Sequence, residues 1–405
     1  MGTAMYAGVS ALQSQQTRLN VIGNNIANLN TVGFRSGRVV FQDLLSQTIT
    51  SASAPQGGRG GINPRQIGLG VTVASIDTNF NQGALLASNG VADFAVQGDG
   101  LFIIADGTRR YYSRDGSFGL DSNGTLVEPA TGYTVQGYSA VNGVIDESQP
   151  IGNIVIPVGG AGRTSATTVA TMLGNLDSRA TVGDTVQRGI RVYDSLGTLQ
   201  EVTVTFTRAA ANEYTWAATH PIAGAVGSGT IVFDVNGQVS SGGSGTISIP
   251  LTNGAQTPFA FTLDMNGVTQ HAVDHTIALS NQNGFPPGVL ESFSIGQGGT
   301  IVGIFSNGMT EVLGQVALAV FNNPGGLVRA ASNLYTASPN SGFAREGLPG
   351  TGGRGTVSGG VLEGSNVDIA TEFSNLIVTQ RAFQAAARSI TAADTLLSES
   401  VNLLR

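Results

Sequence analysis

The 405-residue sequence contains no cysteine, and its 19 basic residues are all arginine. Disulfide bonds, thiol catalysis, cysteine-ligated metals, lysine Schiff bases and P-loop lysines are therefore excluded. Charged residues make up only 11% of the chain, against about 25% in an average globular protein. The formal net charge of −7 argues against nucleic acid as the main partner.

The sequence also lacks the patterns that direct a chain into a membrane. No apolar run approaches the roughly 20 residues of a membrane helix, so we expect no membrane insertion. The first 16 residues carry no basic residue and no compact apolar core followed by a small-residue cleavage site. We therefore expect no cleaved signal peptide.

Residues that could form a catalytic or metal site are few. The three histidines are His220, His271 and His275. The last two are four residues apart, which could place both on one face of a helix as metal ligands. Their surroundings do not have a helical pattern, and Gly98-Asp99-Gly100 lacks the helix and lysine of a phosphate loop. A Ser-His-Asp arrangement is not excluded by composition, but no Gly-x-Ser-x-Gly motif lies between a strand and a helix. We expect no enzyme activity, no cofactor and no metal.

Glycine is abundant, at 58 residues, and has no three-residue period, which indicates short strands and tight turns. Asp115-Gly116, Asn123-Gly124 and Thr131-Gly132 recur eight residues apart and predict consecutive hairpins. Alternating apolar and polar residues predict strands in the middle of the chain. These strands are expected over 201–208, 230–235, 246–251 and 258–265.

Both ends of the chain predict long amphipathic helices, over residues 3–28 and from 369 onward. Apolar residues recur at alternating spacings of three and four, as at the a and d positions of a coiled coil. Polar Gln16, Gln380 and Asp394 fall at the same positions, where such residues fix register. Ser365 or Asn366 is expected to cap the second helix. The expected subunit-packing residues are Met5, Val9, Leu12, Leu19, Ile26, Phe373, Leu376, Phe383, Ile390, Leu397, Val401 and Leu404.

Flexible segments separate these helices from the β regions. Residues 51–64 and 347–360 are rich in glycine and other small residues, which is typical of linkers. The helices therefore have no evident domain surface to pack on. Isolated helices are marginal in water, so we expect the ends to be largely disordered in the free monomer and to fold when copies pack together.

The expected fold is mainly β with α-helical coiled-coil termini and nested, discontinuous domains. Residues 1–33 and 361–405 would form a helical inner core, and residues 34–70 and 346–360 a connector. Residues 71–145 and 285–345 would form an inner β domain, with an outer β domain over 146–284.

Two motifs near the ends resemble the signatures of bacterial flagellar rod and hook proteins. The N-terminal motif comprises Asn24, Asn25, Ile26, Ala27, Asn28, Thr31, Gly33 and Phe34, followed by Arg35. The C-terminal motif comprises Ser365, Asn366, Val367 and Asp368, with Gln380 and Arg381 further on. In the middle, Tyr193-Asp194-Ser195-Leu196-Gly197 resembles the outer domain of hook proteins, and Leu313 to Ala319 resembles their inner β domain. The variant opening, Met1 to Tyr6, and the long connector depart slightly from the family pattern.

The resemblance implies a structural subunit that polymerises into the hook, a flexible tube that transmits torque from rod to filament. It implies export through the flagellar type III apparatus and an extracellular location in the flagellum. The implied partners are further copies of the chain, the distal rod protein, the hook cap and the hook–filament junction proteins. A rod or junction protein, a secreted β-rich adhesin and a hydrolase with helical oligomerisation ends remain as alternatives.

Overall fold

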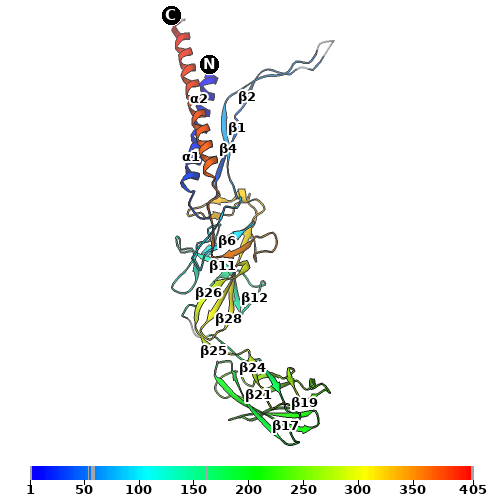
Figure 1. The fold of residues 1–405 in the computed structure, drawn as a ribbon. Coiled ribbons are helices and arrows are strands. Elements are labelled where there is room, and N and C mark those ends of the chain that lie inside the picture. The colour runs from blue at the N-terminus through cyan, green and yellow to red at the C-terminus, as the bar shows by residue number, and fades with distance from the viewer. Residues whose placement is uncertain (1, 53, 56–59, 160–162, 403–405) are drawn as a thin grey trace. The chain divides into compact units, whose positions relative to one another are not determined.

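The computed structural model describes residues 2–52, 54–55, 60–159 and 163–402. Helix α1 (Gly2–Ala27) begins the chain and helix α2 (Ile369–Asn402) ends it, and most of the remaining elements are strands (Figure 1). The predicted fold class, mainly β with helices at both termini, is confirmed. Neither helix is long and apolar enough to cross a membrane, within the residues just given.

The chain divides into two discontinuous units. Unit 1 contains residues 1–156, 294–302 and 312–405, and unit 2 contains residues 157–293 and 303–311. Strands β26 (Leu290–Ile295), β27 (Thr300–Phe305) and β28 (Thr310–Val316) have residues in both units. Each unit is described below by itself.

Unit 1 combines the two helices with many short strands. Its short 3-10 helices are η1 (Gln297–Gly299) and η2 (Pro324–Gly326). Its strands are β1 (Gly37–Asp43), β2 (Ser46–Thr50), β3 (Arg65–Gly68), β4 (Val71–Thr78), β5 (Leu85–Ala87), β6 (Phe94–Gln97), β7 (Leu101–Asp106), β8 (Arg109–Ser113), β9 (Gly119–Leu120), β10 (Leu126–Val127), β11 (Thr134–Val141), β12 (Val144–Ile145), β13 (Gly152–Asn153), β29 (Leu318–Val320), β30 (Val328–Arg329), β31 (Tyr335–Thr336), β32 (Arg345–Gly347), β33 (Thr356–Gly359) and β34 (Val361–Glu363).

The main sheet of unit 1 contains the antiparallel order β28-β11-β7-β8-β31-β30. Strand β7 is apolar along almost its whole length, and its first five residues are buried. A continuous apolar run of this kind is typical of a strand covered on both faces. Its side chains join a buried cluster with Tyr112, Phe321 and Tyr335.

Unit 2 is built from two five-stranded sheets and one two-stranded sheet. Its strands are β14 (Arg163–Ser165), β15 (Val169–Asn175), β16 (Thr185–Tyr193), β17 (Leu199–Ala210), β18 (Glu213–His220), β19 (Gly224–Phe233), β20 (Val239–Ser241), β21 (Ser244–Ile249), β22 (Phe259–Asp264), β23 (Val268–Thr269), β24 (Ala278–Gln282) and β25 (Phe285–Gly288). The orders are β16-β17-β18-β19-β20 in one five-stranded sheet and β21-β22-β15-β23, with β24 beside β15, in the other.

The two five-stranded sheets of unit 2 share one apolar core. Alternate residues of β17, among them Val202, Val204 and Phe206, are buried. They belong to the same cluster as Ile247 and Phe261 of the second sheet. All four predicted strands of this region are present as β17, β19, β21 and β22, since period-two alternation marks strands with one buried face.

Two of the three predicted hairpins are present. Asn123-Gly124 joins β9 to β10 and Thr131-Gly132 joins β10 to β11, and both pairs are antiparallel. Asp115-Gly116 does not close a hairpin. A Cβ at Gly116 would lie 1.9 Å from the Phe94 carbonyl oxygen, so this glycine serves close backbone packing instead.

The absence of a packing surface for α1 was a wrong expectation. The segment expected as a connector contains β1, which pairs with β4, and α1 contacts both strands. Small residues allow the close approach. A Cβ at Gly70 would lie 2.4 Å from the Ser10 hydroxyl, which accepts a hydrogen bond from the Val71 amide at 3.3 Å.

Unit 2 offers a stability test at its single tryptophan. A Cβ at Gly245 would lie 2.1 Å from the Trp216 ring, which is 2% exposed. We predict that Gly245→Ala destabilises unit 2 by about 1–3 kcal/mol, as overpacking does. Denaturant unfolding followed by Trp216 fluorescence measures this. Gly189→Ala is the matched control, because a Cβ there meets nothing within 4 Å; equal unfolding midpoints for the two variants would contradict the prediction.

Candidate functional site

The two signature motifs meet in unit 1. We define the terminal joint as residues 24–37, which comprise the last turn of α1 and the segment after it, together with residues 361–372, which end in the first turn of α2. The Gly33 amide donates to the Glu363 carbonyl oxygen at 2.8 Å, and the Asn366 amide to the Phe34 carbonyl oxygen at 3.4 Å. Residues more than 300 positions apart in the sequence are therefore direct neighbours.

Asn25 links three elements of the joint. It is 1% exposed, and its Nδ2 donates to the Gly37 carbonyl oxygen at 2.9 Å and to Glu372 Oε1 at 3.0 Å. Its Oδ1 accepts from the Gly37 amide at 2.9 Å. One amide side chain thus connects α1, the start of β1 and the first turn of α2.

The turn after α1 depends on one glycine and two polar side chains. Asn28 donates to the Asn24 carbonyl oxygen, and Thr31 donates to Asn28 Oδ1. Gly33 has φ +68°, and a Cβ there would lie 2.4 Å from the Asp115 amide nitrogen. Glycine is the residue that fits both the left-handed backbone and the close approach.

A second amide, Asn366, connects the joint from the C-terminal side. Its Oδ1 accepts from the Ser36 amide at 2.8 Å, and its Nδ2 donates to the carbonyl oxygens of Asn79 and Asn81 at 2.8 and 3.0 Å. Because these bonds occupy the side chain, Asn366 does not cap α2.

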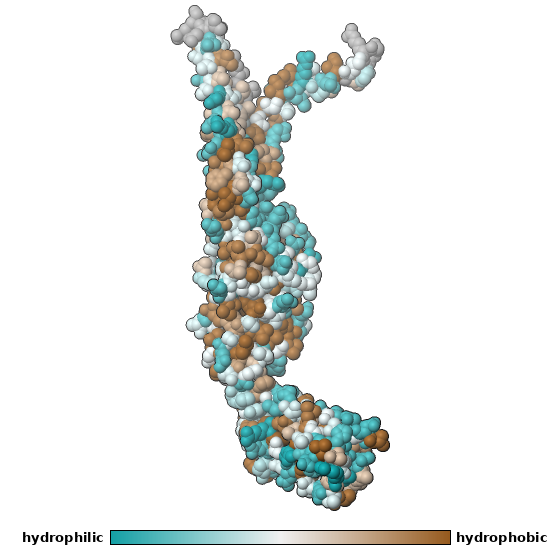
Figure 2. Space-filling model, in the orientation of Figure 1, coloured by the Kyte–Doolittle hydropathy of each residue, from teal (hydrophilic) through white to brown (hydrophobic). Residues whose placement is uncertain are grey.

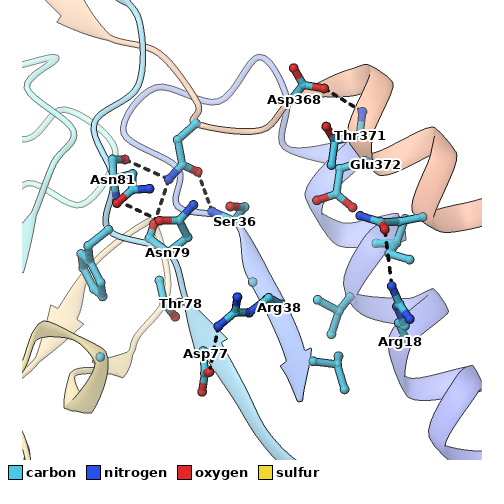
Figure 3. Close-up of a pocket in the computed structure, with 18 of the residues that line it drawn as sticks. Arg18, Ser36, Arg38, Asp77, Thr78, Asn79, Asn81, Asp368, Thr371 and Glu372 are labelled. Carbon is cyan, nitrogen blue, oxygen red and sulfur yellow. Dashed lines mark hydrogen bonds and ion pairs between the residues drawn. The ribbon is translucent and has the colours of Figure 1, made fainter. Parts of the chain in front are cut away.

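The residue that caps α2 is Asp368, which corrects the expectation of Ser365 or Asn366. Asp368 Oδ1 accepts from the Thr371 amide at 2.7 Å (Figure 3). This bond, the largest cause, lowers the pKa of Asp368 below its usual range. The Ser365 hydroxyl instead accepts from the Val367 amide at 3.4 Å.

The centre of the joint is a buried ionic cluster. The Glu363 side chain is 0% exposed; its Oε1 accepts from Arg35 Nη2 at 2.7 Å and its Oε2 from Arg114 Nη1 at 3.1 Å. The Gly83 amide also donates to Glu363 Oε1 at 2.7 Å. Arg114 donates further to the Val96 and Gly98 carbonyl oxygens. Burial lowers the pKa of Arg114, and the charge of Glu363 partly opposes that shift.

Phe34 and Arg35 are held by an arginine that the sequence did not indicate. Arg329 lies over the Phe34 ring, with its guanidinium carbon 5.2 Å from the ring centroid, and donates to the Arg35 carbonyl oxygen. Arg114 and Asn81 were missed in the same way. Nothing in their local sequence marks them, since their partners are distant in the chain.

Most of the predicted packing residues that the structure describes are half-buried in the single copy, and the others are exposed. Ile390 of α2 approaches α1 closely, since a Cβ at Gly8 would lie 2.7 Å from its Cγ1, and the small residues Thr379 and Ala393 of α2 are buried. Val9 is 42% exposed, Phe373 50%, Phe383 36% and Val401 60%. The half-buried members are Met5, Leu12, Leu19, Ile26, Leu376, Ile390 and Leu397. Leu404 lies outside the described residues.

Further apolar side chains on α2 add to this exposed surface. Ile369, Ile377 and Val378 are 48–59% exposed, beside Phe373. Figure 2 shows apolar surface along the helical part of unit 1. Gln380 and Arg381 of the C-terminal motif are also exposed, far along α2 from the joint, and so are Asn24 and Ala27.

A groove of about 760 Å³ lies beside the joint (Figure 3). Val21, Phe41 and Phe80 contribute apolar lining. The charged lining residues are the acids Asp77, Asp368 and Glu372 and the bases Arg18 and Arg38. Burial raises the pKa of Glu372 above its usual range, and the hydrogen bond from Asn25 partly opposes this shift.

The histidines are engaged in structural contacts in unit 2. His275 Nδ1 accepts from the Asp177 amide at 3.1 Å, and His220 Nε2 lies 3.2 Å from Gln200 Oε1. Among the described residues, no group of three or more His, Asp or Glu side chains is placed to hold a metal ion.

Four family patterns match successive parts of the chain. The family described as flagella basal body rod protein matches residues 5–35, and flagellar basal body rod FlgEFG protein C-terminal matches 358–403. Flagellar hook protein FlgE/F/G D1 domain matches 95–171, and flagellar basal body protein FlaE D2 domain matches 163–285. With two helices joined at their signature motifs, these matches define a flagellar axial protein of the rod and hook class.

Relatives over the full length distinguish members of this class. The chain is 40% identical to the flagellar hook protein FlgE of Borreliella burgdorferi over all of both chains. It is 36% identical to FlgE of Salmonella typhimurium over 98% of each chain, and 30% identical to the basal-body rod protein FlgG of Bacillus subtilis over 99% of each chain. The chain belongs to the family of the flagellar hook protein FlgE. The crystal structure of Helicobacter pylori flagellar hook protein FlgE2 matches 70% of this chain and 99% of that chain, with a TM-score of 0.50 and 13% identity, which supports the fold alone.

The buried ionic cluster can be tested by removing its one carboxylate. We predict that Glu363→Gln destabilises unit 1 by about 3–5 kcal/mol, because it leaves two buried arginines without a counter-charge. Calorimetry measures the unit 1 transition, while Trp216 fluorescence follows unit 2 and should not change. Glu201→Gln is the control, since its pair with Arg191 is exposed on both sides and worth about 0–1 kcal/mol. A Glu363→Gln effect as small as the control would refute this role of the cluster.

Asn25 and its neighbour Asn24 form a second matched pair. We predict that Asn25→Ala destabilises the joint by about 1–3 kcal/mol, because it leaves buried hydrogen-bonding groups of Gly37 and Glu372 unpaired. Hydrogen exchange of the α1 and β1 amides should accelerate accordingly. Asn24→Ala, at an exposed position, should leave exchange in β1 unchanged. Unchanged β1 exchange in Asn25→Ala would contradict the bridging role.

Proposed function

We propose that this chain is the structural subunit of the flagellar hook, a tube assembled from copies of the chain that transmits torque from rod to filament. Full-length identity to FlgE relatives supports this assignment. The structural observation that carries it is the exposed apolar surface of the two terminal helices. Large exposed apolar patches on a folded chain mark interaction sites.

The terminal helices would form the inner core of the tube. Full burial of a Val, Leu, Ile or Phe side chain contributes about 1.5–3 kcal/mol, and α1 and α2 together expose several. Thr379 and Ala393 are already buried within one copy, whereas Val9, Phe373, Phe383 and Val401 are exposed, so these four side chains are left for contacts between copies. This arrangement supports the subunit-packing role proposed for Val9, Phe373, Phe383 and Val401.

The β regions would form the outer layers. We assign residues 71–145 and 285–345 to an inner β domain, 146–284 to an outer domain, and 34–70 with 346–360 to a connector between helices and sheets. The outer sandwich has a core of its own, so it can move as one body when the tube bends. Few charged residues would let such surfaces slide without strong ion pairs.

Assembly at the cell surface requires further partners. We propose that the chain leaves the cell through the flagellar type III export apparatus, without a cleaved signal peptide, and is extracellular in the flagellum. It would join the distal rod protein at one end of the tube, the hook–filament junction proteins at the other, and grow beneath the hook cap. The role is structural and not enzymatic.

Assembly of the purified protein tests this proposal. We predict that the full chain, concentrated in a precipitating salt, forms tubes visible by negative-stain microscopy. The double variant Val9→Ser/Phe373→Ser should raise the critical concentration for assembly at least tenfold, since each loses about 1.5–3 kcal/mol of burial and 1.4 kcal/mol corresponds to a factor of ten.

A matched control separates helix packing from general loss of apolar surface. Ile222 and Val235 in unit 2 are 91% and 94% exposed, and Ile222→Ser/Val235→Ser should assemble like the parent chain. A parent chain that remains monomeric while both units are folded would refute the hook assignment and favour the secreted adhesin.

A further inference from the structure

Phe343 is the most exposed large apolar residue in the described part of the chain, with a relative exposure of 96%. Its neighbour Ala344 is partly buried against the core of unit 1, and Arg345 after it is exposed again. This alternation places the phenyl ring and the guanidinium on the same, outward side of the segment. A single exposed apolar residue is ordinary. Whether Phe343 can bind a partner therefore depends on how rigidly the backbone holds it.

The turn before Phe343 is fixed by hydrogen bonds. Ser341 is 0% exposed; its hydroxyl donates to the Ser338 carbonyl oxygen at 2.9 Å and accepts from the Ser338 amide at 2.9 Å. Asn323 Nδ2 donates to the Asn340 carbonyl oxygen at 3.0 Å. A Cβ at Gly326 would lie 2.8 Å from the Asn340 carbonyl carbon, so the turn packs directly on η2.

Such a turn fixes the backbone from which the ring projects before any partner binds. Preorganised aromatic and arginine side chains lose little conformational entropy on binding, and these residue types dominate the energetics of protein interfaces. Phe343 and Arg345 together therefore have the form of an interface anchor, with an apolar ring beside a cation.

The groove beside the terminal joint has the complementary chemistry. Val21, Phe41 and Phe80 provide apolar lining for a ring. Asp77, Asp368 and Glu372 outnumber the two arginines of the lining. One of these, Arg18, already donates to Asn375 at 3.4 Å. The other, Arg38, pairs with Asp77 at 3.7 Å, and both side chains of this pair remain exposed. The groove thus has room for an aromatic side chain and one more carboxylate than arginines.

We propose that the groove of one copy receives Phe343 and Arg345 of a second copy. The proposal rests on the hook function proposed above and names one contact within that polymer. The residues of the anchor differ from those that line the groove, so one-way insertion from copy to copy gives a head-to-tail contact. Each copy keeps a free anchor at one side and a free groove at the other, which propagates a filament instead of closing a dimer.

Mixed single-cysteine copies test which surfaces meet, because the parent chain has no cysteine. Arg345→Cys copies and Asp77→Cys copies are assembled together and treated with a short bis-maleimide. We predict a cross-linked dimer on a denaturing gel, which no link within one copy can produce. The adduct should be lost when the Arg345→Cys copies also carry Phe343→Ala. Asp274→Cys, at a position 94% exposed in unit 2, replaces Asp77→Cys in the control and should give no adduct.

The outcomes separate this contact from the hook function. Tubes that form without the Asp77 adduct, or with an equal adduct at Asp274, overturn the contact and leave the hook function intact. A parent chain that forms no tubes overturns both.

Assembly of Phe343→Ala gives an independent measure. Its critical concentration should rise about tenfold, as expected for loss of a buried phenyl ring, with thermal unfolding unchanged because the ring is exposed in the single copy. Ile222→Ala is the matched control and should assemble normally. An unchanged critical concentration for Phe343→Ala would overturn the proposal.

Discussion

The buried carboxylate of Glu363 is the constraint on which the arrangement of unit 1 depends. Taking a charge out of water costs several kcal/mol, and attraction to a partner offsets this cost only when the geometry is good. Arg35 follows α1, Arg114 lies in the sheet region, and Glu363 precedes α2. No two of these segments can be placed correctly without the third. The cluster therefore couples the two ends of the chain to the β region, and its main contribution is to specify one arrangement.

Beyond this joint the two helices keep several large apolar side chains exposed, among them Val9, Phe373 and Val401. Asn25 and Asn366 satisfy backbone groups at the base of the helices. A joint closed by buried hydrogen bonds resists twisting, because any rotation would leave buried groups unpaired. Stiffness in torsion can therefore originate within each copy, while the number and fit of contacts between copies govern bending.

The sequence predicted the helices and strands well, but it predicted few of the side-chain contacts between them. The helices follow from the three- and four-residue spacing of apolar side chains. The strands of unit 2 follow from two-residue alternation, because one face of each is buried in that unit. Periodicity could not show that the exposed face of α1 carries Val9 while Ser10 and Ser14 meet β4, since apolar residues usually mark the buried side. The cap at Asp368 was missed because the side chain of Asn366, an equally good cap by residue type, is occupied by backbone groups of Ser36, Asn79 and Asn81, which are far away in sequence. Arg114 had no local signal at all.

The contacts of the joint require arginine side chains, which agrees with the absence of lysine from the chain. A guanidinium carries five donors in a planar fork and binds several acceptors at once, whereas an ammonium is a compact, strongly hydrated charge. Arg114 uses its fork for the Glu363 carboxylate and two backbone carbonyl oxygens, and Arg329 combines a carbonyl oxygen with the face of Phe34. Neither set of contacts can be reproduced by lysine. The chain has few charges, so the arginines of the joint act mainly through the directions of their N–H donors and less through net charge. A composition with arginine and no lysine is therefore the one that these contacts require.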